Sequence, residues 1–136
     1  MTSYGLVLVT APSEEEAKAI ALSLVESQLA ASVSITPVFS TYTWLGKLER
    51  HSEWQLMVRT KLNLFETLEA RVRELHSYEV PEIIALPIIA GSQPFLDWID
   101  EQAIANSKEE FDIAKYAGAI QLGKDPLEYQ KEIRGE

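Results

Sequence analysis

Apolar residues recur with two different periods along this chain, and the order of these periods limits the folds that it can adopt. Residues 4–10 form a short run rich in Leu and Val that leads into a proline, which is typical of a buried strand. Ser13 and Glu16 then form a capping-box pattern, so a helix is expected to begin here. The apolar residues of this helix recur at helical spacing and are Ala17, Ile20, Ala21, Leu24 and Val25.

A long segment with a period of two follows this helix. Residues 32–46 place apolar side chains on both faces of a predicted strand, and residues 54–61 alternate in the same way. The polar residues 46–52 between them predict a turn, so the two strands form a β-hairpin. Pro37 cannot donate a backbone hydrogen bond and marks an edge strand or a bulge. Because helices of the same chain cover one face only, we expect the large aromatic residues on the other face to meet another subunit.

A second helix and a last strand complete the pattern. Asn63 followed by Glu66 predicts a helix cap. Pro81 ends the helix, and the apolar run at residues 82–90 has the length of a strand. A third helix is expected from Pro94. The apolar stripe of the second helix is Leu64, Phe65, Leu68, Val72 and Leu75.

The resulting order is β-α-β-β-α-β followed by a C-terminal helix. This order predicts an α+β fold of the ferredoxin-like, split βαβ type, in which two helices cover one face of an antiparallel sheet. A chain of 136 residues is long enough for one such domain and too short for two well-developed ones. The face of the sheet opposite the helices must be solvated or covered by a neighbour.

The composition excludes several classes of function. A formal net charge of -9 opposes binding to a phosphate backbone, so no nucleic-acid partner is expected. No apolar run approaches the roughly 20 residues that span a bilayer, and the first residues lack the pattern of an export signal. We therefore expect no membrane association and a cytoplasmic location. The absence of cysteine excludes a disulfide, a thiol nucleophile and a thiolate metal site.

Four segments of the chain are distinctive: LAASVSI at residues 29–35, YTWLGKLE at 42–49, VRTKLNLFETLEARVRELHSYEVPEIIALPI at 58–88 and FLDWIDE at 95–101. In their order and spacing they resemble the CutA divalent-cation tolerance proteins. The third is the most specific, because it joins HSYEVPEI to the helix before it. The resemblance covers about residues 4–102 and divides the chain into a CutA-like domain, residues 1–102, and a C-terminal extension, residues 103–136.

The resemblance implies a ferredoxin-like homotrimer in which long strands pair across subunits, akin to the architecture of the PII signalling proteins. It also implies an association with copper and other divalent metals, and no enzymatic reaction. Ser32 departs from the family pattern, because relatives often carry a cysteine there. A soft Cu(I) site thereby loses its usual ligand type, which leaves Cu(II) or another divalent metal bound by imidazole and carboxylate. No organic cofactor is expected.

His76, Glu79 and Glu82 are the candidate metal ligands. Imidazole is the commonest neutral metal ligand, and the two carboxylates follow it closely in the sequence. One histidine with a few carboxylates suggests weak binding, which would be stronger where three subunits bring copies together. The alternative is structural: His76 ends the second helix and hydrogen-bonds nearby carbonyls, while Glu79 pairs with a lysine or arginine.

A second group of residues is predicted to line an intersubunit cleft: Trp44, Lys47, Lys61 and Tyr78. With two lysines, such a cleft suggests a PII-like sensor of a small anionic ligand. Against this hypothesis, the chain has no glycine-rich phosphate loop and its overall charge is negative. The alternative for the two aromatic residues is packing at an interface.

The C-terminal extension carries more apolar residues than a solvated tail requires. We expect it to pack on the trimer or to bind a protein partner, and a trimeric scaffold that presents this segment is a further hypothesis for function. Its apolar residues are Phe111, Ile113, Tyr116, Ile120, Leu122, Leu127, Tyr129 and Ile133.

Overall fold

The structure, a computed structural model, describes residues 3–105. No helix in this range is long and apolar enough to cross a membrane. Most of the predicted extension, residues 106–136, lies outside the described residues, so the expectations for its packing and partners stay predictions. In chain order the elements are β1 (Tyr4–Ala11), α1 (Glu14–Glu26), β2 (Ser32–Trp44), β3 (Lys47–Lys61), the 3-10 turn η1 (Leu62–Leu64), α2 (Phe65–Leu75), β4 (Ile83–Pro87) and α3 (Gln93–Gln102).

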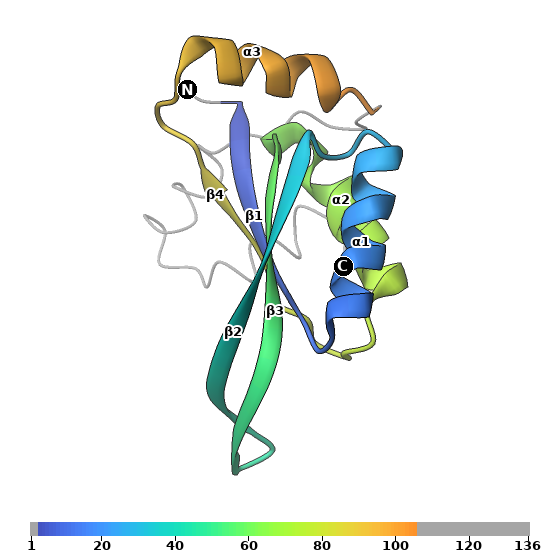
Figure 1. The fold of residues 1–136 in the computed structure, drawn as a ribbon, viewed down its shortest axis with the longest axis vertical. Coiled ribbons are helices and arrows are strands. Elements are labelled where there is room, and N and C mark those ends of the chain that lie inside the picture. Colours follow the sequence, from blue (N-terminus) through green and yellow to red (C-terminus); the bar gives the residue numbers. More distant parts are fainter. Residues whose placement is uncertain (1–2, 106–136) are drawn as a thin grey trace, which may run out of the picture.

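The four strands form one antiparallel sheet in the order β2-β3-β1-β4. α1 and α2 lie side by side on one face of this sheet, and α3 crosses one end of it (Figure 1). This arrangement confirms the predicted α+β, ferredoxin-like fold. β2 is an edge strand, so of the two alternatives predicted for Pro37, an edge strand or a bulge, the edge strand is confirmed.

The core lies between the two covering helices and the central strands. Val7 and Val9 of β1 pair with Val58 and Leu56 of β3, and all four side chains are fully buried. Alternate residues of β1 are buried, because a strand that lies under helices on one side turns every second side chain toward them. The helices contribute Ala17, Ile20, Leu24, Phe65, Leu68 and Val72 to the same cluster.

The two helix caps predicted from the sequence have different outcomes. Ser13 caps α1, and its hydroxyl accepts a hydrogen bond from the backbone N–H of Glu16, as the capping pattern predicts. Asn63 does not cap α2: it lies within η1, and the N-cap of α2 is Leu64, which makes no side-chain capping bond. Leu62 and Leu64 are both buried, so packing of the turn against the core sets this boundary rather than capping.

The β2–β3 hairpin is longer than predicted. β3 begins at Lys47 and not at residue 54, and the turn contains only Leu45 and Gly46. These two residues have φ values of 51° and 78°, and a two-residue type I′ turn requires positive φ at both positions. The hairpin extends beyond the helices (Figure 1), so residues 47–52 are paired without showing the apolar period of a buried strand.

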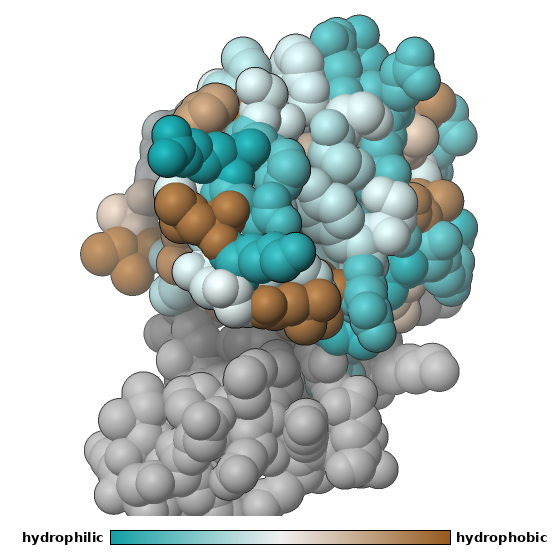
Figure 2. Space-filling model, turned by 90° about the horizontal axis from the view of Figure 1, so that it is seen from below, coloured by the Kyte–Doolittle hydropathy of each residue, from teal (hydrophilic) through white to brown (hydrophobic). Residues whose placement is uncertain are grey.

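Two apolar surfaces remain uncovered within the described residues. On the hairpin, the exposed fractions are 85% for Leu45, 69% for Phe39 and 64% for Leu48. Seen from the hairpin end, separate hydrophobic groups lie among hydrophilic ones (Figure 2). The second surface is the face of the sheet opposite α1 and α2, which carries Leu6, Leu8, Ile84 and Leu86.

β4 is shorter than the predicted strand at residues 82–90. It ends at Pro87, which pairs with Gly5 near the start of β1, so a longer β4 would run past its partner strand. α3 begins at Gln93, one residue before the predicted start. Both differences are small. The end of the partner strand limits β4, and Pro94 lies in the first turn of α3, where proline is tolerated.

Candidate functional site

The loop at residues 76–82 joins α2 to β4 and carries the three predicted metal ligands. The backbone N–H of His76 donates to the carbonyl of Val72, which is the last bond of α2, and the chain then becomes extended, with φ -85° and ψ 138° at His76. Pro81 excludes any continuation of the helix. The loop therefore leaves α2 in a defined direction and passes the end of β1, so its side chains can contact β1 and β3.

The side chain of His76 is fully buried and both of its ring nitrogens are hydrogen-bonded. Nδ1 accepts from the backbone N–H of Tyr78 at 3.0 Å. Nε2 lies 2.7 Å from the carbonyl oxygen of Thr10. Because Nδ1 accepts, we assign the proton to Nε2, which donates to Thr10. The predicted structural role of His76, a hydrogen bond to a nearby carbonyl, is confirmed, with the carbonyl supplied by β1.

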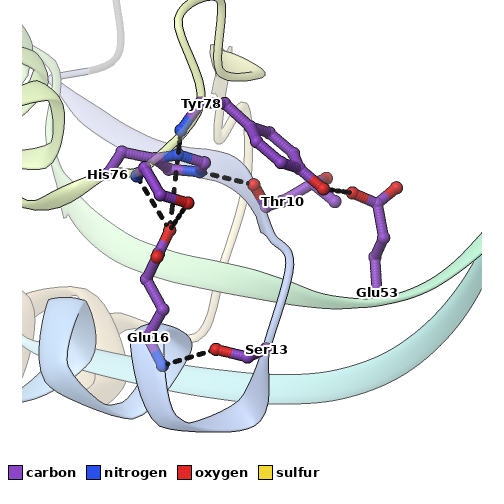
Figure 3. Close-up of polar contacts among 7 residues, drawn as sticks. Thr10, Ser13, Glu16, Glu53, His76 and Tyr78 are labelled. Atoms are coloured by element: carbon purple, nitrogen blue, oxygen red, sulfur yellow. Dashed lines mark hydrogen bonds and ion pairs between the residues drawn. The ribbon is translucent and has the colours of Figure 1, made fainter.

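Glu16 of α1 fixes the residue after His76. Its Oε2 accepts from both the backbone N–H and the hydroxyl of Ser77, at 3.1 Å each, and lies 3.5 Å from His76 Nδ1 (Figure 3). The same residue supplies the N–H that Ser13 caps. The first turn of α1 and the loop are thus held together by one carboxylate.

Tyr78 crosses to β3 and meets a buried acid. Its hydroxyl donates to Oε2 of Glu53 at 2.7 Å, and Glu53 is only 4% exposed. Burial, followed by the hydrogen bond to Glu53, raises the pKa of Tyr78 far above the ordinary value of a tyrosine, because both disfavour the charged phenolate. Tyr78 therefore stays a protonated donor. Glu53 was not among the residues predicted from the sequence.

The two remaining predicted metal ligands differ in their surroundings. Glu82 accepts a short hydrogen bond from the hydroxyl of Thr10, while Glu79 is exposed. Within residues 3–105, Glu79 has no ion pair with a lysine or arginine, so the structural alternative for this residue is not seen there. Both carboxylates line the same groove.

This groove has a volume of about 830 Å³ and lies between the distal half of the hairpin and the loop. Of the predicted residues it brings together Trp44, Tyr78, Glu79 and Glu82, whereas His76 is not part of its lining. Carboxylates dominate its charge: Glu49, Glu53, Glu79 and Glu82. Tyr42, Trp44 and Tyr78 supply the aromatic part of the wall.

The predicted lysines lie elsewhere. Lys61 forms an ion pair with Asp100 of α3 at 3.4 Å, and neither Lys47 nor Lys61 belongs to the lining of the groove. Since the lining contains neither lysine nor arginine, the groove of a single chain does not favour an anionic ligand. The hypothesis of a PII-like sensor for such a ligand stays an untested prediction without support from this geometry.

The donor set of one chain does not fit a metal ion. Across the described part of the chain, no group of three or more His, Cys, Asp or Glu side chains is close enough to hold one. Both ring nitrogens of His76 are already bonded, so coordination by His76 would cost one of these two hydrogen bonds. Metal binding by His76, Glu79 and Glu82 therefore stays a prediction that needs ligands from more than one copy.

Comparison with known proteins identifies the family. The model of the CutA1 divalent ion tolerance protein family matches residues 5–102. The chain belongs to this family. The divalent-cation tolerance protein CutA of Thermus thermophilus is 48% identical over 97 residues, which are 71% of this chain and 94% of that protein. The CutA of Archaeoglobus fulgidus is 44% identical, over 72% of this chain and 96% of the relative.

Solved structures of CutA proteins share the fold. The structure from Archaeoglobus fulgidus, described as a periplasmic divalent cation tolerance protein, has a TM-score of 0.73 at 42% identity and covers 74% of this chain and 99% of its own. The structure from Thermus thermophilus has a TM-score of 0.72 at 46% identity with the same coverage. A relative from Arabidopsis thaliana, 44% identical over 95 residues, is described as chloroplastic.

Proposed function

We propose that this CutA1 family member is a cytoplasmic, non-enzymatic homotrimer with PII-like architecture that acts in divalent cation tolerance and binds Cu(II) or another divalent metal weakly. The observation that carries the proposal is the match of residues 5–102 to a family described by divalent ion tolerance. The acidic groove supports it, because carboxylates attract divalent cations. The absence of cysteine favours a metal that accepts oxygen ligands over soft Cu(I).

The uncovered apolar surfaces support the trimer. Leucine and isoleucine side chains lie on the sheet face opposite the helices, and the distal hairpin exposes Phe39, Leu45 and Leu48. Exposure of such an apolar surface to water is unfavourable, and its burial under a second copy stabilises the assembly. A closed ring of three copies would cover both surfaces without leaving an open end.

The metal is proposed to lie between copies. Glu79 and Glu82 are exposed carboxylates on the rigid loop before β4, and neither belongs to a set of three ligands within residues 3–105. Carboxylates of different subunits would complete the set. His76 would join only after giving up one hydrogen bond, so its first role in this proposal is to fix the loop.

Calorimetric titration of the full chain with Cu(II) tests the metal site. The double variant Glu79→Gln/Glu82→Gln should bind at least about tenfold more weakly, since it removes two charged oxygen ligands. The matched control is Glu66→Gln/Glu74→Gln, which makes the same charge change on exposed positions of α2 and should bind like the wild type. Equal affinity of both double variants would contradict the site, and an unchanged His76→Ala affinity would remove His76 from it.

Size-exclusion chromatography with light scattering tests the assembly. The proposal expects the mass of three chains at micromolar concentration. A monomer under these conditions would overturn the trimer, and with it the intersubunit metal site.

A further inference from the structure

The outer face of α1 carries two apolar side chains that lie open to solvent in the described range. Leu22 is 59% exposed and points away from the core, since the residues two places before and after it, Ile20 and Leu24, are buried. Val25 is 42% exposed, although its spacing placed it in the apolar stripe of the helix. The surfaces proposed for the trimer do not include this face, because α1 covers the other side of the sheet (Figure 1).

The described part of the chain ends beside this face. The backbone N–H of Ala105 donates to the carbonyl of Gln28 at 3.1 Å. Gln28 lies just beyond α1, and its own N–H donates to the carbonyl of Val25 at 3.1 Å. Leu22 precedes Gln28 by roughly 9 Å along the helix axis. The chain that follows Ala105 therefore begins within about two helical turns of both exposed side chains.

The sequence of the C-terminal extension predicts an amphipathic helix. Ser107 and Glu110 form a capping-box pattern. Gly123 has the position of a C-terminal cap, with Pro126 beyond it. An isolated helix of about 15 residues is marginal in water, so this one needs a surface on which its apolar stripe can pack. The stripe has the spacing i, i+3, i+4 and i+7 and consists of Ile113, Tyr116, Ala117 and Ile120.

Length and charge favour a course back along α1. α1 has 13 residues and is roughly 20 Å long, and a helix over residues 108–122 would be roughly 22 Å long. The link from Ala105 to the start of the stripe spans up to roughly 25 Å when extended, which exceeds the distance to Leu22. An antiparallel course also brings Lys124 toward the first turn of α1, which carries three glutamates at residues 14–16.

We propose that residues 107–122 bind as a helix along the outer face of α1 of the same chain, antiparallel to it. Ile113 and Tyr116 then cover the two exposed side chains of α1. This docking goes beyond the proposed function and uses no residue of the groove or of the metal site. A second copy of the chain and a separate protein are the other possible occupants of the face, and the tests distinguish them.

Disulfide trapping in the full chain tests the contact, and the absence of native cysteine makes it specific. Leu22→Cys/Tyr116→Cys should form an intrachain disulfide under mild oxidation, identified by peptide mapping without reductant. The control pair Glu74→Cys/Tyr116→Cys, with its first cysteine on an exposed position of α2, should form far less. Equal yields of the two pairs would overturn the proposal. Covalent dimers of Leu22→Cys/Tyr116→Cys would also overturn it, because they assign the face to a second copy.

Thermal unfolding of the full chain gives an independent test. On an open helix face, Leu22→Ala should leave Tm unchanged or slightly higher, because alanine has the higher helix propensity. Under a docked helix the same change removes buried contacts and should lower Tm by at least about 4 °C. In an Ile113→Ala/Tyr116→Ala background, Leu22→Ala should no longer lower Tm.

Two results of the thermal test would contradict the docking. An unchanged Tm of Leu22→Ala would show that nothing covers the face in the full chain, which leaves the extension to a separate protein. An equal loss of Tm in both backgrounds would show that something other than Ile113 and Tyr116 covers Leu22.

Discussion

The hydrogen bond from Tyr78 to Glu53 can be removed by deleting one atom. Tyr78→Phe keeps the ring in the wall of the groove and removes only the hydroxyl that lies 2.7 Å from Glu53 Oε2. This hydroxyl is the one hydrogen-bond donor to Glu53 within residues 3–105. The substitution therefore leaves a carboxylate that is 4% exposed without any donor in that part of the chain.

The cost of this change follows from the burial of the acceptor. A hydrogen bond to a charged group contributes about 1.5–3 kcal/mol, and leaving a buried charged acceptor without a donor places the cost in this range. For a domain of this size, about 4 °C of Tm corresponds to 1 kcal/mol. We therefore expect Tyr78→Phe to lower Tm by about 6–12 °C.

Scanning calorimetry at one fixed protein concentration measures this shift, and a double-mutant cycle assigns it. Tyr78→Phe made in a Glu53→Gln background should cost only about 0.5–1.5 kcal/mol, since the acceptor is then neutral. Tyr42→Phe is the matched control, because its hydroxyl makes no hydrogen bond within the described residues. The reasoning is refuted if Tyr78→Phe costs the same in both backgrounds, or no more than the control.

Further predictions concern pH, the turn, the core and the assembly. Burial raises the pKa of Tyr78, so the folded state keeps a proton that the unfolded chain loses above about pH 10. The free energy of unfolding should therefore fall as pH rises above that value. In thermal unfolding, Tm should fall less steeply with pH for Tyr78→Phe than for the wild type. Gly46→Ala should lower Tm by a few degrees, because alanine tolerates the φ of 78° less well than glycine, and an unchanged Tm would count against the turn assignment. Gly5→Ala should cost about 1–3 kcal/mol in urea unfolding, because its Cβ would lie 2.5 Å from Cδ2 of Leu62, and a neutral outcome would mean that Leu62 moves freely. Ile84→Lys places a charge on the uncovered sheet face and should reduce the mass measured by light scattering, whereas an intact trimer would place the interface elsewhere.

Local sequence signals predicted the fold where one face of an element is buried. Ser13 capped the first helix as predicted, and Pro37 lies on an edge strand. The start of β3 at Lys47 could not be predicted from apolar period, because the distal hairpin has no core to face within its own chain. Asn63 failed as a cap because buried neighbours determined the start of α2, and such packing depends on residues distant in sequence.

The candidate site was predicted only in part. The sequence pointed to the loop with His76, Tyr78 and Glu79, and the structure places that loop beside the groove, with the two last residues in its lining. Nothing in the sequence indicated that the His76 ring binds the end of β1 or that Glu53 is buried, because both depend on contacts between segments that are distant in the chain. The alternation of β3 places Glu53 on the face opposite Leu56, but it predicts only the face and not the burial of the side chain.

The protruding hairpin divides the chain into two zones of local stability. Within a single chain, β2 and β3 beyond the helices hold each other mainly by their own backbone ladder, so without a covering copy their amide protons should exchange through local opening, while those of the core strands wait for global unfolding. Tyr42, Trp44 and Glu49 belong to the first zone, whereas Glu53, Tyr78 and Thr10 are anchored to the second. A neighbouring copy that covers the distal hairpin must therefore slow amide exchange there, which makes exchange in this segment a measure of assembly.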